Sequence, residues 1–594
     1  MTDVTHTLEI LPEGTKVRVR AGENLAEALA RAGIPVSLYC HRRGVCGKCA
    51  VRVRVGLLPL LDESEKAVLD KRGLPPDYRL ACRFSVCGGL VVEVPPEARL
   101  GRIPVLEAGP SLPMAVDPQV KKLALSLEKP PLSAPAAVTE VLGAVLGTPG
   151  LRLSLPVLRT LKNLDSALPL TVTAVLWGER EVLAVETGDT SGRAFGLAVD
   201  IGTSTVVVDL VDLVTGRSAG RASALNSQAS YGSDVVSRIA FAFQNTDNLK
   251  RLRKSIGHLI NDLAGELSAA AGVPRENIYE AVVAGNTAMN HFLCGVSVDS
   301  LALAPFNAVF AALPPFPASE IGLELNAAAR AFIVPNIKSF VGGDITAGLA
   351  ACSLAGKPGN VLFVDIGTNG EIVLKKGSQF IATSTAAGPA FEGMSISCGM
   401  LAVEGAVHRA GWRDGGFRLE TIGGGAPLGL CGTGLVDAVA VGLARGLVGR
   451  DGKIAGPEKK IRLGDRLSLT QNDIREIQLA VGAVRSGIRL MLREQRMSLK
   501  DLDAVYVAGA FGGSLDIRNA QALGLLPAVP EEKIAFVGNA SLAGARKLLL
   551  SAAARAEAEA LAGTIAHVSL AARPDFQDEF VGALEFGRFE GGER

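Results

Sequence analysis

Four cysteines have the spacing of a metal centre. Cys40, Cys46 and Cys49 share one short segment, and Cys82 follows after a gap of 32 residues. The chain has nine cysteines, an odd number, and crowding of this kind indicates thiolate ligands rather than a disulfide framework. Three thiolates on one loop can wrap around metal, and a fourth from another segment would fix that loop in place. We therefore expect these four side chains to bind a metal or a cluster.

The spacing C-x5-C-x2-C with a distant fourth cysteine favours a [2Fe-2S] cluster. It is one residue longer in its first gap than the C-x4-C-x2-C pattern of plant-type ferredoxins. Gly44 and Gly47 would let the backbone curl so that its N–H groups face the sulfur atoms. A zinc site remains the alternative, but it would need two C-x2-C pairs and only one is present. Residues 1–97 resemble the ferredoxin family in its adrenodoxin-like spacing, with Cys87 left over.

The predicted cluster loop is basic. Between residues 28 and 61 there are six Lys or Arg and no Asp or Glu, and Arg42, Arg43 and Lys48 lie within the loop. The excess either compensates an anionic cluster or forms a docking face, and the sequence leaves both open.

A second constellation, repeated 165 residues apart, has the features of a phosphate site. Asp200-Ile-Gly-Thr and Asp365-Ile-Gly-Thr each follow an apolar strand, and each is followed later by a strand ending in Ala-Gly, at Gly285 and Gly509. The glycine of such a turn lets backbone N–H groups reach phosphate oxygens, and the threonine adds a hydroxyl. The two aspartates are placed to hold Mg2+ through water. We expect Asp200 and Asp365 to be the catalytic carboxylates.

The repeat predicts two α/β halves with a nucleotide between them. The residues expected to bind it are those of the two turns and of a glycine run suited to lie against adenosine: Gly202, Thr203, Ser204, Thr205, Gly367, Thr368, Asn369, Gly370, Gly509, Ala510, Phe511, Gly512 and Gly513. An α/β protein with glycine turns and no nucleotide is the alternative.

Residues 195–590 resemble the ASKHA superfamily, which includes sugar kinases, heat-shock chaperones and actin. By this resemblance the two Asp-Ile-Gly-Thr turns are the phosphate motifs and Gly509 to Gly513 the adenosine motif. The segment from Gly432 to Asp437 fits the start of a connecting helix, and Gly342-Gly343-Asp344 fits the wall of the nucleotide site.

The helices and strands expected to position these residues indicate a multidomain protein with both α+β and α/β domains. A hairpin over 7–11 and 16–20 and a helix over 24–32 are typical of a β-grasp domain, here 1–97. Nine prolines lie between 95 and 135, so we expect a semi-rigid linker at 98–116. A small α+β unit, a spacer or dimerisation unit, is expected over 117–192, with strands at 120–127, 170–177 and 181–186 and helices at 137–146 and 157–164. The ASKHA domain would fill 193–594, with its repeats starting near 198 and 363.

The composition argues against several classes of protein, namely nucleic-acid binders, membrane proteins and secreted proteins. With 61 Lys and Arg against 60 Asp and Glu, the chain lacks the charge of a nucleic-acid binder. The most apolar stretch, 301–318, contains four prolines, and the N-terminus has no secretory pattern, so a cytoplasmic protein without membrane spans is expected. The six histidines are isolated and form no hydrolytic or zinc motif.

The fusion of a [2Fe-2S] module with an ATP-binding core resembles the reductive activators of corrinoid proteins. The likeness extends to Asn226–Ile239, to the glycine-rich segment from Ala387 to Met400 that includes Glu392, and to Gln471–Ala480. One departure is Val481, where a lysine would be expected beside the nucleotide.

The resemblance implies an ATPase-coupled oxidoreductase that reduces a corrinoid protein from Co(II) to Co(I) with one electron. Its partners would be that corrinoid protein and an upstream low-potential electron donor, and a homodimer is compatible with it. A plant-type cluster near −400 mV is too weak a donor for Co(I), so ATP would favour the productive complex. The segment from Ala387 to Met400 is either the face for the corrinoid partner or a wall of the ATP site.

Two other functions share parts of this pattern. An activator of a 2-hydroxyacyl-CoA dehydratase or benzoyl-CoA reductase would hold a [4Fe-4S] cluster across a dimer through two core cysteines. The candidates Cys294, Cys352, Cys398 and Cys431 are scattered among apolar residues and resemble small buried hydrophobes. A kinase with a ferredoxin arm would instead need a small-substrate pocket with a carboxylate base.

Overall fold

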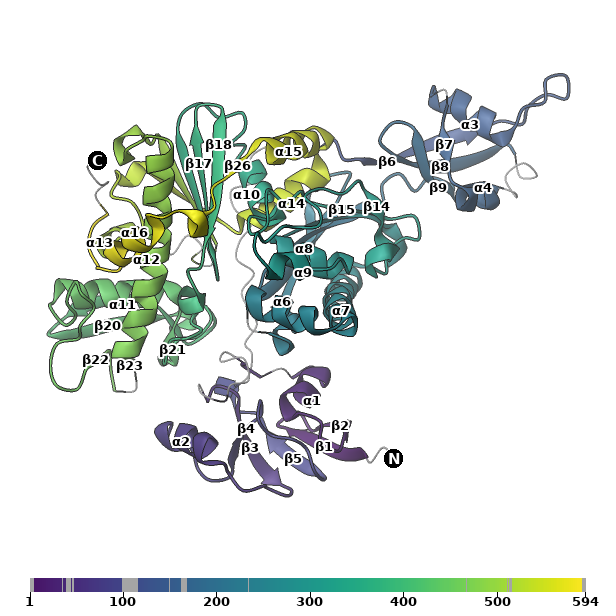
Figure 1. The fold of residues 1–594 in the computed structure, drawn as a ribbon. Coiled ribbons are helices and arrows are strands. Elements are labelled where there is room, and N and C mark those ends of the chain that lie inside the picture. The colour runs from purple at the N-terminus through teal and green to yellow at the C-terminus, as the bar shows by residue number, and fades with distance from the viewer. Residues whose placement is uncertain are drawn as a thin grey trace.

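The computed structural model describes residues 5–34, 36–38, 44, 47–98, 116–148, 150–161, 168–232, 234–465, 467–509, 511 and 515–589. Figure 1 shows an N-terminal module, a small unit near β6 and two α/β halves joined side by side. Within the described residues, no helix combines the length and apolarity needed to cross a bilayer.

The N-terminal module is a five-stranded sheet of order β2-β1-β5-β3-β4 with two helices packed on it. Its elements are β1 (Thr5–Leu11), β2 (Thr15–Arg20), α1 (Leu25–Arg31), β3 (Ala50–Val55), α2 (Glu63–Lys71), β4 (Tyr78–Leu80) and β5 (Leu90–Glu93). Asn24 begins α1 because its side chain accepts a hydrogen bond from the Ala26 N–H. Leu8, Leu25 and Leu29 are fully buried beneath the sheet. The predicted hairpin, helix and β-grasp class are confirmed.

The small unit contains a four-stranded sheet of order β6-β8-β9-β7. Its elements are β6 (Val120–Leu127), α3 (Val138–Leu146), β7 (Arg152–Leu153), α4 (Leu155–Thr160), β8 (Leu170–Trp177) and β9 (Glu181–Thr187). The helix predicted at 157–164 begins two residues earlier, because Ser154 precedes it and a proline occupies its first turn; residues 162–164 lie outside the described residues.

The first α/β half is a six-stranded sheet of order β12-β11-β10-β13-β15-β14. Its strands are β10 (Phe195–Ile201), β11 (Thr205–Asp212), β12 (Ser218–Leu225), β13 (Ile278–Gly285), β14 (Phe316–Pro317) and β15 (Arg330–Ile333). Its helices are α6 (Val235–Gln244), α7 (Thr246–Ala271), α8 (Thr287–Cys294), α9 (Asp299–Ala302) and α10 (Gly343–Ala351). Every residue of β13 is buried, as expected for a central strand covered on both faces.

The second half repeats five strands of this topology, in a sheet of order β25-β24-β16-β17-β18-β26. The sixth strand differs, because β26 pairs with β18 at the edge opposite to the one that β14 occupies in the first half. Its strands are β16 (Val361–Ile366), β17 (Gly370–Lys376), β18 (Gln379–Thr385), β24 (Ala504–Gly509), β25 (Ile534–Gly538) and β26 (Ala566–His567). Its helices are α12 (Gln471–Glu494), α13 (Ile517–Leu523), α14 (Ala540–Leu550), α15 (Ala552–Thr564) and α16 (Phe576–Ala583).

The duplication inferred from the sequence is visible in the strand registers. In the first half Asp200 lies opposite Ala284, and Ile201 lies opposite Gly285 on a parallel neighbour. In the second half Asp365 pairs with Ala508 and Ile366 pairs with Gly509 in the same way. Both halves therefore use the same strand pair to form the edge at which the predicted phosphate turns lie.

Two helices join the halves by crossing between the sheets. Helix α14 follows the last parallel strand of the second half, yet Leu542, Leu548 and Leu549 pack with the first sheet. Helix α10 follows the first half, and its Ile345 and Leu349 pack with the second. The helices touch closely at Gly544, where a Cβ atom would lie 1.9 Å from the Ala347 carbonyl oxygen.

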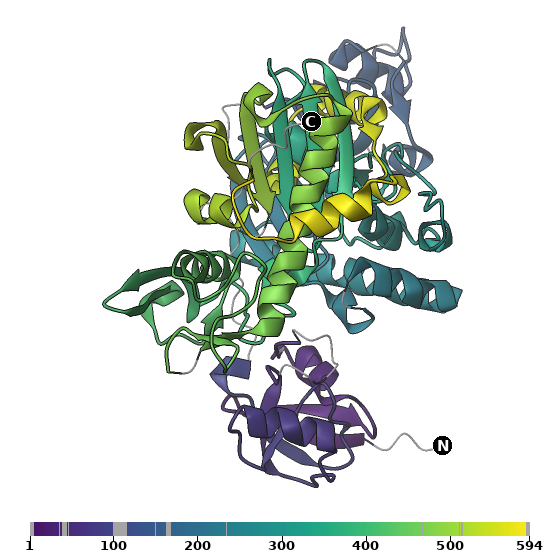
Figure 2. The same ribbon diagram turned by 60° about the vertical axis from the view of Figure 1, so that its left-hand side comes forward.

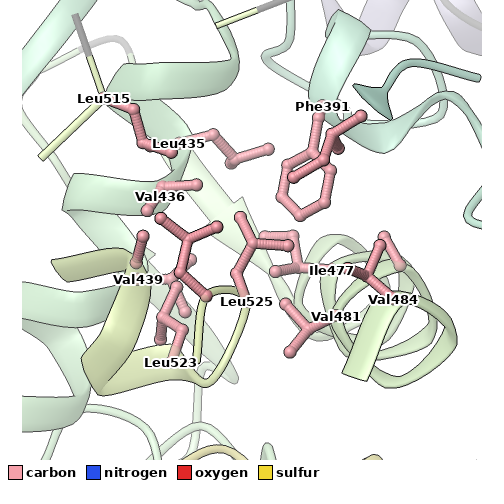
Figure 3. Packing of buried hydrophobic residues seen from close by; sticks show 14 of the residues in the cluster. Phe391, Leu435, Val436, Val439, Ile477, Val481, Val484, Leu515, Leu523 and Leu525 are labelled. Atoms are coloured by element: carbon pink, nitrogen blue, oxygen red, sulfur yellow. The ribbon is translucent and has the colours of Figure 1, made fainter. Parts of the chain in front are cut away.

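An insertion in the second half carries two small sheets beside α12. It consists of β19 (Ala406–Arg413), β20 (Gly416–Thr421), β21 (Gly429–Leu430), α11 (Gly432–Ala444), β22 (Lys460–Arg462) and β23 (Ser468–Thr470). Helix α11 starts at Gly432, as predicted for the connecting helix. Its Leu435, Val436 and Val439 pack with Ile477 and Val484 of α12 in the largest apolar core (Figure 3).

Candidate functional site

The two predicted phosphate turns lie at equivalent strand ends, one in each half. Gly202 makes the first turn tight, because a Cβ atom there would lie 2.8 Å from the Thr205 carbonyl oxygen. Gly509 has a φ of +102°, and a Cβ atom there would meet the Ile366 carbonyl oxygen at 2.4 Å and the Asp365 carboxylate at 2.6 Å. A glycine at the end of the neighbouring strand is therefore required for the backbone to pass the aspartate so closely.

Asp200 is held by residues from the opposite half. Its carboxylate accepts hydrogen bonds from Asn539 Nδ2 at 2.8 Å and Ser541 Oγ at 2.7 Å. Both donors lie at the start of α14, so the crossing of the helices positions them. Burial raises the pKa of Asp200, and the two hydrogen bonds act against that rise.

The first turn is fixed from three directions. Arg238, fully buried on α6, donates from Nη2 to the Thr203 carbonyl oxygen at 2.7 Å. Asn286 Nδ2 donates to Thr203 Oγ1 at 3.2 Å, and Asn226 Nδ2 donates to the Gly202 carbonyl oxygen at 2.8 Å. Thr205 begins β11. The backbone of the turn is therefore preorganised by neutral amides and one cation.

The second turn is built more simply. The Gly367 N–H donates to the Asn369 carbonyl oxygen at 3.0 Å, and Gly370 begins β17. Thr368 is buried, and its hydroxyl donates to Glu392 Oε1 at 2.7 Å.

Glu392 connects the two turns. Its second carboxylate oxygen accepts a hydrogen bond from the Ser204 hydroxyl of the first turn. Glu392 ends the short helix η6 (Pro389–Glu392), within the glycine-rich segment 387–400. That segment therefore reaches both phosphate turns, which supports the prediction that it forms a wall of this site; its role as a partner face stays a prediction.

Negative charge accumulates around the strand ends. Burial and the neighbouring Asp344 and Asp200 carboxylates raise the pKa of Asp365 to about 8. Burial also raises the pKa of Asp344 and of Glu371, and the charges of neighbouring acids add to both effects. Such a group of acids fits a divalent cation, which would stabilise the charged carboxylates. Among the described residues no three His, Cys, Asp or Glu side chains are arranged to ligate a metal directly.

Two of the four predicted cluster ligands are described, and the backbone brings them together. Ala50 on β3 pairs with Leu80 on β4, and the Ala81 N–H donates to the Cys49 carbonyl oxygen at 3.0 Å. Cys49 and Cys82 are both buried, while Cys87 is exposed. Gly44 and Gly47 have φ values of +71° and +66°, as a tightly curled loop requires. The donor chemistry fits an iron-sulfur cluster; Cys40 and Cys46 lie outside the described residues.

Several predicted residues lie elsewhere. Ala510, Gly512 and Gly513 of the adenosine motif are outside the described part of the chain. Phe511 is buried, with its ring centroid 5.3 Å from that of Phe391. Val481 is 1% exposed within the apolar core of α12, so this position packs against side chains instead of bordering a nucleotide (Figure 3).

Sequence reasoning missed Asn539, Ser541, Asn286 and Glu371. Asn539 and Ser541 contact Asp200 across sequence separations of 339 and 341 residues. A local sequence pattern could have identified the two asparagines. In each half a strand ends in glycine, at Gly285 and Gly538. Asn286 and Asn539 follow these glycines directly, and each begins a helix. A Gly-Asn pair at a parallel strand end would have identified two of the four.

The N-terminal module lies below the start of α12 (Figures 1 and 2). Burial and the nearby Asp473 carboxylate raise the pKa of the Cys398 thiol, whereas the ammonium of Lys48 acts in the opposite direction. Lys48 immediately precedes Cys49, so the described end of the predicted cluster loop lies near the glycine-rich segment that carries Glu392.

Comparison with known families accounts for nearly the whole chain. Four sequence models match in order: the 2Fe-2S iron-sulfur cluster binding domain at 8–87, the RACo linker region at 111–192, the RACo middle region at 195–357, and the C-terminal domain of RACo, the ASKHA domain, at 359–590.

Named relatives agree with this assignment. The corrinoid activation enzyme RamQ of Eubacterium limosum is 28% identical over 595 residues, covering 95% of this chain and 96% of that protein. The [Co(II) methylated amine-specific corrinoid protein] reductase of Methanosarcina barkeri is 28% identical over 387 residues, covering 60% of this chain and 70% of that one.

A solved structure matches over the full length. It is the reductive activator for corrinoid, iron-sulfur protein, at 35% identity and a TM-score of 0.74, with 98% of each chain covered. A match of this extent, together with the order of the four regions, shows that the chain belongs to the RACo family.

Proposed function

We propose that this protein is an ATP-dependent reductive activator of a corrinoid protein. One electron passes from its reduced [2Fe-2S] cluster to the inactive Co(II) corrinoid, which becomes Co(I), and the cluster is left oxidised. The observation that carries the proposal is the full-length match to a reductive activator, with the cluster module and both phosphate turns in the same chain.

Electron transfer and nucleotide binding are assigned to different parts of the chain. Cys40, Cys46, Cys49 and Cys82 would hold the cluster, which supplies the electron. Asp200 and Asp365 would hold Mg2+ through water, and the hydroxyls of Ser204 and Thr368 would bind phosphate. The amides Asn286, Asn539 and Asn226 fix the turns and the first aspartate in place. Gly509 lets its strand pass close to Asp365, and the glycine run that it begins would lie against the adenosine side of the nucleotide.

ATP is needed because the electron must go uphill. A plant-type cluster has a potential near roughly −400 mV, and Co(I) lies lower. Binding energy from the nucleotide can favour the conformation in which the partner accepts the electron, and hydrolysis can then release that partner. The two halves, joined through Glu392 and through Asp200 to α14, are the two-state element that a nucleotide would bias.

The cysteine chemistry also bears on where in the cell the protein works. Five of the nine cysteines are crowded between Cys40 and Cys87, as suits thiolate ligands in a reducing compartment, and we propose that the chain works in the cytoplasm. The upstream electron donor and a homodimeric state remain predictions.

The test is UV-visible spectroscopy of a corrinoid protein loaded with cobalamin, mixed with the full chain, a reductant and Mg-ATP. Co(I) should form with ATP and should form far more slowly without it. Absence of Co(I), or equal rates with and without ATP, would refute the proposal.

A further inference from the structure

Glu392 occupies the hydroxyl groups that the proposed function assigns to phosphate. One carboxylate oxygen accepts from Thr368 Oγ1 at 2.7 Å, and the other accepts from the Ser204 hydroxyl. Ser204 belongs to the first half and Thr368 to the second, so one side chain ties the halves together. The inference drawn here rests on the proposed function, since it depends on ATP binding at these turns.

The groups around Glu392, two hydroxyl donors and a guanidinium, would favour a bound anion as well as a carboxylate. The buried guanidinium of Arg238 lies close enough for its positive charge to lower the pKa of Glu392, against the rise that burial causes. Arg238 is itself fixed, because it also donates from Nε to the Gly232 carbonyl oxygen at 2.9 Å. Two hydroxyl donors and a nearby guanidinium are the groups that would receive a phosphate oxygen. The carboxylate and a nucleotide phosphate therefore compete for the same partners.

Movement of Glu392 would pass directly into the segment that follows it. Gly393 has a φ of +75°, and a Cβ atom there would lie 2.5 Å from the Met400 carbonyl oxygen. A Cβ atom on Gly399 would lie 2.2 Å from the Gly393 carbonyl oxygen. The two ends of the segment 393–400 are thus in backbone contact, and one cannot shift without the other.

The segment is also joined to α12 and lies near Lys48 of the N-terminal module. Ser397 donates from its backbone N–H and its hydroxyl to the Asp473 carboxylate, both at 2.6 Å. Asp473 lies in the first turn of α12, and Cys398, next to Ser397, feels the charge of Lys48 beside the predicted ligand Cys49. Contacts therefore run from the phosphate turns to the first turn of α12, and Lys48 of the N-terminal module lies near enough for its charge to act on the Cys398 thiol.

We propose that Glu392 is a positioning residue that reports nucleotide binding to the cluster module. Without nucleotide it holds the Ser204 and Thr368 turns together. When phosphate takes those hydroxyls, the carboxylate is displaced and the segment 393–400 shifts against the cluster loop.

The variant Glu392→Gln removes the competing charge while keeping the size of the side chain. Glu404→Gln is the matched control, because Glu404 is an exposed carboxylate twelve residues downstream. Binding of Mg2+ with the non-hydrolysable analogue AMPPNP is measured by calorimetry on the full, cluster-loaded chain. We expect E392Q to bind the analogue about tenfold or more tightly, because a negative charge a few ångströms from phosphate is removed, and E404Q to bind as the wild type does.

Hydrogen–deuterium exchange of residues 389–403 is the second measurement. In the wild type, AMPPNP should increase exchange there. In E392Q, exchange should already be raised without nucleotide and should change little on binding. Ser204→Ala removes one of the two donors and should raise exchange without nucleotide in the same way, which keeps the test valid if E392Q folds poorly.

The outcomes separate this inference from the function on which it rests. If the wild type binds no nucleotide, the proposed function is wrong and the inference with it. If nucleotide binds but leaves exchange of 389–403 unchanged, or if E392Q binds more weakly than the wild type, the inference alone is overturned.

Discussion

The raised pKa of Asp365 determines how the stability of the nucleotide-free protein should depend on pH. The pKa of Asp365 is raised to about 8 by burial and by neighbouring carboxylates, whereas an unfolded aspartate titrates near ~3.9. The folded chain therefore holds a proton that the unfolded chain has lost between these values. A raised folded-state pKa contributes stability that is fully present below pH ~4 and is lost as the pH rises towards 8.

We therefore predict that Asp365→Asn flattens the pH dependence of stability. Between pH 5.5 and 8 the wild type without Mg2+ should lose up to ~1.4 kcal/mol per pH unit from this group, and the variant should lose less over that range. Thermal unfolding at several pH values measures the difference. Added Mg2+ should reduce the wild-type loss, because the cation stabilises the charged carboxylates. Parallel curves for wild type and variant would show that Asp365 titrates normally.

At this scale the sequence predicted the aspartates and turns but not their partners. Asp200, Gly202 and Thr203 were recognisable because they recur at Asp365, Gly367 and Thr368. The Ser204–Glu392 contact spans 188 residues, and a hydrogen bond between such distant positions leaves no local pattern. The burial of Val481 could not be predicted for a related reason, since which face of α12 meets the core depends on tertiary packing.

Among the elements, the pair α10 and α14 has the least tolerance for change. At Gly544 the backbones of the two helices are in contact, so any side chain must push Ala347 away. Gly563 on α15 is the natural comparison, because a Cβ atom there would meet nothing within 4 Å.

We predict that Gly544→Ala destabilises the protein by about 1–3 kcal/mol, in the range of overpacked cores. The control Gly563→Ala should be neutral or stabilising by up to ~1 kcal/mol, because alanine favours a helix. Urea unfolding monitored by circular dichroism compares the three proteins. Equal stability of G544A and G563A would show that the helices can separate without cost.

Most elements could be predicted because their signals are local. The strand predicted at 170–177 and the helix predicted at 137–146 follow from alternation, helical periodicity and glycine punctuation, and they agree with β8 and α3 to within one residue. That α10 packs on the second sheet and α14 on the first could not be predicted. Both helices are apolar on more than one side, so either sheet could bury their apolar residues.

For the molecule as a whole, the small unit is attached to the first half by a buried polar group. Lys122 on β6 donates to Glu186 at 2.7 Å, to the Arg193 carbonyl oxygen at 3.1 Å and to the Tyr279 hydroxyl at 3.2 Å. Tyr279 lies on β13, and its own hydroxyl donates to Glu186. The Lys122 side chain is fully buried, so its charge is satisfied only by this network.

Lys122→Met should therefore loosen the junction while keeping the apolar stem. We predict a loss of about 1–3 kcal/mol, because Glu186 and Tyr279 lose a charged partner in a largely buried setting. Lys121→Met is the control: Lys121 is the exposed neighbour, and its change should stay within about 0.5 kcal/mol. The melting temperature and the hydrogen exchange of residues 181–190 test the prediction. Similar behaviour of K121M and K122M would mean that the network adds nothing to the junction.

The packing of α14 on the first sheet has a consequence for how the protein is made. The first sheet is covered by α14, and Asp200 finds its partner Asn539 only 339 residues later. At about 5–20 residues per second, the ribosome needs roughly 17 to 70 s to deliver that segment. Throughout this interval the nascent first half leaves Ala198, Val207 and Val282 without their cover. The first phosphate turn is therefore completed only after the segment that contains Asn539 and Ser541 has been synthesised.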